Sequence, residues 1–116
     1  MAGLSTHILD TSTGKPAVNV KIELFEGDSP NPVVTSHSNS DGRTDAPLIA
    51  AGNLRKGIYQ LHFHAGDYLR TNKIDNLPSV PFLDVVVIRF GIDNTDQHYH
   101  VPLLFSPYGY STYRGS

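Results

Sequence analysis

Three histidines in this sequence stand where strand alternation would hold their imidazole rings in fixed positions. His98 and His100 both lie in HYHVPLLF (98–105), and alternate side chains of a strand share one face. His7, in LSTHILD (4–10), shares a face with Ser5 and Leu9. The opposite face of the later segment is hydrophobic and consists of Tyr99, Val101, Leu103 and Phe105. Imidazole has an unperturbed pKa of ~6.5, so rigidly held histidines favour acid–base chemistry near neutral pH.

The remaining histidines have a plainer interpretation, because a single strand histidine is more often a surface or hydrogen-bonded core residue than a catalytic one. His62 and His64 fall on the polar face of their strand, and His37 stands beside a turn rich in Ser and Asn. Two histidines in an HxH pair can reach one metal ion if a third ligand is present. No Asp or Glu stands at a sequence spacing that identifies it as this third ligand, so the sequence favours no metal site.

Composition and motifs exclude several classes of function. The formal net charge is −2 and Lys and Arg form no cluster, which argues against nucleic-acid and membrane-surface partners. The chain contains no cysteine, so thiolate catalysis and disulfides are excluded. It lacks the GxSxG, P-loop and GxGxxG motifs of serine hydrolases and nucleotide-binding proteins. Without a signal-peptide pattern or a long apolar run, we expect a cytoplasmic protein.

Alternation with period two dominates the chain, and its 116 residues are enough for one domain, residues 1–116. In the half-buried strand predicted at 18–26, the inward face consists of Val18, Val20, Ile22 and Leu24. One short helix is predicted at 65–72, and 47–57 is interpreted as a loop. Many short strands in a small domain predict an all-β sandwich or barrel. The other predicted strands cover 4–10, 32–38, 57–64, 84–92, 98–106 and 108–114.

Three segments resemble the transthyretin-related 5-hydroxyisourate hydrolases: LSTHILDTSTGKPA at the start, SDGR at 40–43, and HYHVPLLFSPYGYSTYRGS at the end. The resemblance spans the chain and is most specific at the terminal YRGS, where transthyretin itself, a hormone carrier, departs. It implies a transthyretin-like two-sheet antiparallel β-sandwich of eight strands with one short helix. It also implies a homotetramer, a dimer of dimers, with active sites where two dimers meet.

The resemblance further implies an activity, hydrolysis of 5-hydroxyisourate to 2-oxo-4-hydroxy-4-carboxy-5-ureidoimidazoline, without a metal or organic cofactor. Its matching catalytic residues are His7, Arg43 and His100. Either histidine would take a proton from water, while the other orients the water or protonates the leaving nitrogen. Arg43 would bind the substrate and stabilise the developing anion, because its guanidinium is planar and always protonated.

The terminal residues Tyr113, Arg114, Gly115 and Ser116 complete the implied substrate site. Tyr113 would cover the substrate ring, Ser116 would bond to substrate or water, and Gly115 would let the backbone approach closely. Arg114 is either a second substrate anchor or an ion-pair partner that holds the tail. The alternatives are a carrier of a small aromatic ligand in a tetramer channel, which needs no YRGS, and a metal-dependent hydrolase.

Overall fold

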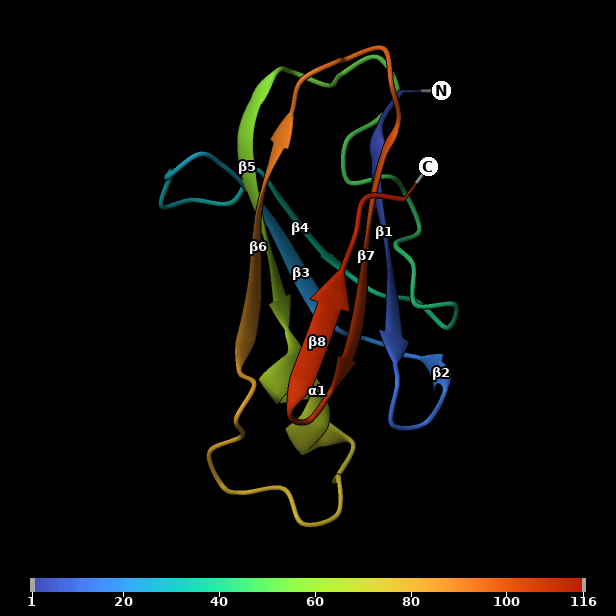
Figure 1. Ribbon diagram of the computed structural model, residues 1–116, viewed down its shortest axis with the longest axis vertical. Helices are drawn as coiled ribbons and strands as arrows, with labels where there is room; N and C mark the ends of the chain where they lie inside the picture. The colour runs from blue at the N-terminus through green and yellow to red at the C-terminus, as the bar shows by residue number, and fades with distance from the viewer. Residues whose placement is uncertain (1, 116) are drawn as a thin grey trace.

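Two four-stranded sheets pack face to face in the computed structural model, which describes residues 2–115 (Figure 1). The first sheet has the strand order β2-β1-β7-β8 and the second β4-β3-β5-β6. The predicted sandwich of eight strands and one helix is therefore confirmed. The elements are β1 (Leu4–Asp10), β2 (Lys15–Pro16), β3 (Lys21–Glu26), β4 (Val34–His37), β5 (Gly57–His64), α1 (Ala65–Thr71), β6 (Val85–Ile92), β7 (Tyr99–Ser106) and β8 (Gly109–Thr112).

The core lies between the sheets and is built from the inward residues of alternating strands. Burying one such aliphatic or aromatic side chain contributes about 1.5–3 kcal/mol, so the alternation of the sequence selects which face of each strand turns inward. In β5, Tyr59, Leu61 and Phe63 face inward, which confirms that His62 and His64 lie on the opposite, polar face of that strand. The fully buried side chains include Leu4, Ile8, Ile22, Leu24, Leu61, Phe63, Leu103 and Phe105.

One strand pair departs from the expected antiparallel arrangement, because β1 and β7 run parallel. Parallel neighbours need a long crossover connection, which here consists of the whole second sheet and α1. The register places Ser5 opposite His100 and His7 opposite Pro102. The beginnings of β1 and β7 thus lie side by side, and the last described residue, Gly115, pairs with His100 in the same part of the first sheet.

The strand predicted at 18–26 begins later than expected, at Lys21. Asn19 adopts a left-handed backbone conformation with φ 62°, which asparagine tolerates better than most residues. Its N–H donates to the carbonyl of Ser38 at 2.8 Å. The alternation is interrupted there, and Val18, predicted to face inward, is 47% exposed.

The predicted helix at 65–72 is confirmed as α1, and it fastens the end of β1. The Tyr68 hydroxyl donates to the Asp10 carboxylate at 2.9 Å, and Asp10 is only 1% exposed. Burial, with the nearby carboxylate, raises the pKa of Tyr68 to about 12. The 47–57 segment is a loop, as predicted, with an isolated bridge between Ile49 and Leu4. Within residues 2–115 no helix is long and apolar enough to cross a membrane.

Candidate functional site

The outer face of the first sheet brings together the histidines singled out by alternation. Ser5 and His7 on β1 and His100 on β7 are half-buried, while the residues between them point into the core. Ser5 and His100 are paired across the parallel strands. The predicted shared faces are confirmed, and the strand register adds that both histidines lie on the same sheet surface.

A tight turn carries Arg43 to this surface. The Gly42 carbonyl accepts a hydrogen bond from the Ile8 N–H at 2.8 Å, so the turn is attached to β1 one residue beyond His7. Gly42 has φ +75°, and a Cβ there would lie 3.3 Å from the His7 ring atom Cδ2 and still closer to the Ile8 carbonyl oxygen. Only glycine combines this conformation with so close an approach.

The Arg43 side chain is exposed and makes no hydrogen bond or ion pair with another residue between 2 and 115. It nevertheless influences the neighbouring imidazole. Burial lowers the pKa of His100 below its ordinary value, and the positive charges of Arg43, His7 and His98 lower that pKa further, against a weaker opposing contact with the Ser5 backbone. His100 therefore stays neutral to a lower pH than a free imidazole would.

A chain of hydrogen bonds runs along the site and includes Ser5, which the sequence did not indicate as functional, and His98, which is not among the catalytic residues that the family resemblance implies. The Gly3 N–H donates to His98 Nδ1 at 3.2 Å. The Ser5 hydroxyl oxygen lies 2.9 Å from His98 Nε2 and 2.8 Å from His100 Nδ1. Alternation predicted that Ser5 shares a strand face with His7, and that His98 shares one with His100. The hydrogen bonds from Ser5 to both His98 and His100 depend on the register of β1 and β7, which alternation does not predict.

The C-terminal segment packs directly on His100. The Gly115 N–H donates to the His100 carbonyl at 2.7 Å, and a Cβ at Gly115 would meet His100 Cδ2 at 2.8 Å. A side chain at this position would displace the imidazole. Tyr113 is 61% exposed, and Ser116 lies outside the described residues.

Arg114 turns to the other side of the tail. Its guanidinium carbon lies 4.1 Å from the centre of the Tyr99 ring, and Nη2 donates to Gln97 Oε1 and to the His98 carbonyl, each at 3.2 Å. Of its two expected roles, these contacts fit the one that holds the tail, through cation–π and hydrogen-bond contacts instead of an ion pair. Substrate binding by Arg114 stays a prediction.

The histidines given a structural interpretation lie on the second sheet. His62 Nε2 is 3.0 Å from Gln60 Oε1, and His64 Nε2 is 2.6 Å from Glu23 Oε1. That contact with His64 lowers the pKa of Glu23. Across residues 2–115, no three or more histidine, aspartate and glutamate side chains are placed to hold a metal ion.

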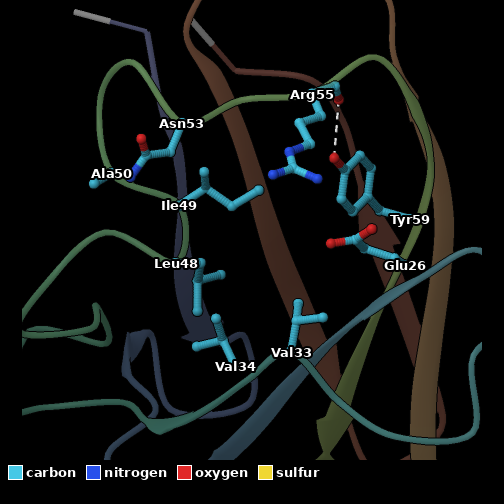
Figure 2. Close-up of a pocket in the computed structure, with 9 residues that line it drawn as sticks. All are labelled: Glu26, Val33, Val34, Leu48, Ile49, Ala50, Asn53, Arg55 and Tyr59. Carbon is cyan, nitrogen blue, oxygen red and sulfur yellow. Dashed lines mark hydrogen bonds between the residues drawn. The ribbon is translucent and has the colours of Figure 1, made fainter.

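A cavity of about 390 Å³ lies elsewhere, between the 48–55 segment and the strands of the second sheet (Figure 2). The Tyr59 hydroxyl donates to the Arg55 carbonyl there at 2.9 Å, and the walls include Val33 and Ile49. It contains none of the histidines of the first sheet. By contrast, the residues around His100 occupy an open sheet face, bordered by a hollow at His98, Arg114 and Gly115.

The arrangement on the first sheet has elements that acid–base hydrolysis requires. A half-buried imidazole kept neutral near pH 7 can exchange or share a proton with water. A guanidinium beside it can stabilise an oxyanion. The backbone of the tail passes close enough to form one wall.

Nearly the whole chain is similar to known proteins of one family. The family model described as Transthyretin, HIUase/Transthyretin family, matches residues 4–115. The 5-hydroxyisourate hydrolase 2 of Rhizobium meliloti (strain 1021) is 55% identical over 97% of this chain and 95% of that protein. The 5-hydroxyisourate hydrolase of Deinococcus radiodurans is 53% identical over 98% of this chain and 96% of that protein.

Two solved structures have the same fold. The Klebsiella pneumoniae 5-hydroxyisourate hydrolase superposes with a TM-score of 0.83 and 34% identity, covering 100% of both chains. The crystal structure of (S)-allantoin synthase gives a TM-score of 0.91 and 40% identity over 99% of this chain, which spans 44% of that longer chain.

Proposed function

Because this chain belongs to the HIUase/Transthyretin family, we propose that it hydrolyses 5-hydroxyisourate to 2-oxo-4-hydroxy-4-carboxy-5-ureidoimidazoline. The observation that carries the proposal is the convergence of His7, Arg43 and His100 on one face of the first sheet. These residues come from β1, from a turn and from β7, and the sandwich core uses none of their side chains. They match the catalytic residues that the family resemblance implies.

In the proposed reaction, water adds to a ring carbonyl carbon and loses a proton to one of the two imidazoles. The carbonyl oxygen takes up negative charge, which the Arg43 guanidinium stabilises. When the oxyanion re-forms the carbonyl, the carbon–nitrogen bond of the ring breaks. The departing nitrogen then receives a proton, so that one water is consumed and the ring opens.

We further propose that the tail forms a wall of this site. The contact of Gly115 with the His100 ring supports the proposal. Tyr113 then covers the substrate ring, and Ser116 bonds to substrate or water. The Arg114 contacts with Tyr99 and Gln97 keep the segment in position.

The proposed activity is tested by following the ultraviolet absorbance of 5-hydroxyisourate freshly generated with urate oxidase. The purified protein should accelerate the decay in proportion to its concentration, and prior treatment with EDTA should leave the rate unchanged. Heat-denatured protein is the control. A folded protein that leaves the spontaneous decay rate unaltered would exclude the hydrolase and favour a carrier of small aromatic ligands.

We propose that the working form is a homotetramer, a dimer of dimers with active sites at the dimer–dimer interface. Two features support this. The site lies on an open sheet face, and the strands that end the two sheets, β6 and β8, are exposed edges. Exposed edges with side chains such as Val87 and Tyr110, 44% and 48% exposed, readily pair with another chain. A cytoplasmic location also stays a prediction.

If the site needs two dimers, specific activity should fall when the protein is diluted until tetramers dissociate. Mass photometry or analytical ultracentrifugation at the assay concentration would give the population of each species. The expected result is a specific activity that follows the tetramer fraction. Constant specific activity in a sample that consists of dimers or monomers would contradict the interface site.

A further inference from the structure

The hydrogen-bond chain beside the site begins at a donor of fixed direction, the Gly3 N–H, and leads to the His100 ring. A backbone N–H can only donate, so His98 Nδ1, which lies 3.2 Å from the Gly3 nitrogen, must accept. His98 Nδ1 therefore carries no proton. In the neutral ring the proton is on Nε2, which is 2.9 Å from the Ser5 hydroxyl oxygen.

The Ser5 hydroxyl passes this direction on to His100. It accepts from His98 Nε2–H, and among residues 2–115 the other hydrogen-bond partner of its oxygen is His100 Nδ1, at 2.8 Å, so we direct its single proton there. His100 Nδ1 is then an acceptor, and the proton of the neutral His100 ring is on Nε2. The reverse direction would leave both nitrogens of His98 without a proton, which an imidazole does not tolerate near neutral pH.

This leads to an inference about the division of labour, which rests on the proposed hydrolase function. We propose that Ser5 and His98 are positioning residues that hold His100 as the neutral Nε2–H tautomer, so that His100 donates a hydrogen bond to the substrate and His7 accepts the proton from water. In the proposed reaction, His100 is thus a hydrogen-bond donor before the water attacks. Of the two histidines that family resemblance leaves interchangeable, only His7 remains available as the base.

The surroundings of His100 favour the same protonation state. Protonation of Nδ1 would direct a second N–H at the Ser5 oxygen, which already accepts from His98, and would force the Ser5 proton to find another partner. The charged or titratable groups around the ring are His7 on β1, His98 before β7 and Arg43 in the turn. Together with burial they lower the pKa of His100, while Gly115, on the tail side, is uncharged.

Nuclear magnetic resonance of protein with ¹⁵N-labelled histidine tests the tautomer without any substrate. In the wild-type protein at neutral pH, His100 should show a protonated Nε2 and an unprotonated Nδ1. A proton on Nδ1 of His100 would overturn the proposal. Because this readout needs no turnover, it is independent of whether 5-hydroxyisourate is the substrate.

Kinetics of Ser5→Ala then test whether the tautomer matters for the reaction. By analogy with outer-shell groups that orient histidine ligands, we expect kcat to fall about 10- to 100-fold. The variant loses the hydroxyl but keeps the Ser5 carbonyl, so the neutral ring loses a stabilising donor and the pKa of His100 rises. The titration of the His100 ring, followed through its ¹⁵N resonances, should therefore move to higher pH.

Matched variants separate positioning from a loss of structure. Ser5→Thr keeps the hydroxyl and should restore most of the activity, and His98→Gln, which can still donate to Ser5, should retain more activity than His98→Ala. Ser36→Ala removes a half-buried strand hydroxyl from the second sheet and should leave kcat unchanged. A Ser5→Ala protein with wild-type kcat and an unshifted His100 titration would contradict the proposed role.

Discussion

Replacing His7 with alanine should lower kcat for 5-hydroxyisourate by about 100- to 10,000-fold, the range that a positioned general base contributes. His7 makes no side-chain hydrogen bond with another residue between 2 and 115, and its ring lies on the outer face of β1. The melting temperature of the variant should therefore stay close to that of the wild type. The decay assay and a thermal melt measure both quantities.

His37→Ala is the matched control, because His37 is an exposed strand histidine on the second sheet. It should leave both kcat and the melting temperature unchanged. If His7→Ala keeps more than a tenth of the wild-type rate, His7 is not the base and the proposed division of labour between the two histidines fails. If His7→Ala and His37→Ala lose activity equally, the loss is not specific to the histidine on the first sheet.

Replacing Arg43 with glutamine should lower kcat/KM by about 100- to 1,000-fold, as removal of one oxyanion-stabilising donor does. Glutamine keeps a donor and much of the length but removes the positive charge. Since that charge lowers the pKa of His100, the substitution should raise that pKa. The neutral imidazole is then lost at a higher pH, which a ¹⁵N titration of His100 measures directly.

Arg55→Gln provides the comparison for Arg43. Arg55 is also exposed and in a loop, but it borders the cavity of Figure 2, away from the histidines of the first sheet. Its substitution should change neither kcat/KM nor the pH profile. An Arg43→Gln enzyme with unchanged kcat/KM would remove Arg43 from the mechanism, and an unshifted His100 titration would contradict its electrostatic effect on His100.

The two-residue repeat of hydrophobic side chains predicted well which face of each strand is buried, because this pattern is local in the sequence. LSTHILD became β1 with the predicted bounds, and His7 and Ser5 do share its outer face. The prediction failed where one residue left the extended conformation. Asn19 turns the chain at φ 62°, and Val18 on its far side therefore faces solvent, although its hydrophobic character fitted the pattern.

Which strands become neighbours could not be predicted from alternation. Ser5 and His100 are separated by 95 positions along the chain, and only the parallel register of β1 and β7 brings the serine hydroxyl within reach of both imidazoles. The role of Arg43 likewise depends on a long-range contact, the hydrogen bond between Ile8 and the Gly42 carbonyl. Its candidacy came from family resemblance, because an arginine after Asp-Gly is commonly a solvated turn residue.

The parallel pairing of β1 with β7 also affects how the protein is made. On the ribosome β1 is among the first segments to emerge, but its partner along its whole length is synthesised near the end of the chain. The nascent chain therefore carries an unpaired β1 edge while the second sheet is already complete in sequence, and such edges are prone to pair with other chains. Translation must nearly finish before the first sheet closes, so a stalled or prematurely ended chain contains a finished second sheet but lacks the pairing that places Ser5 beside His100.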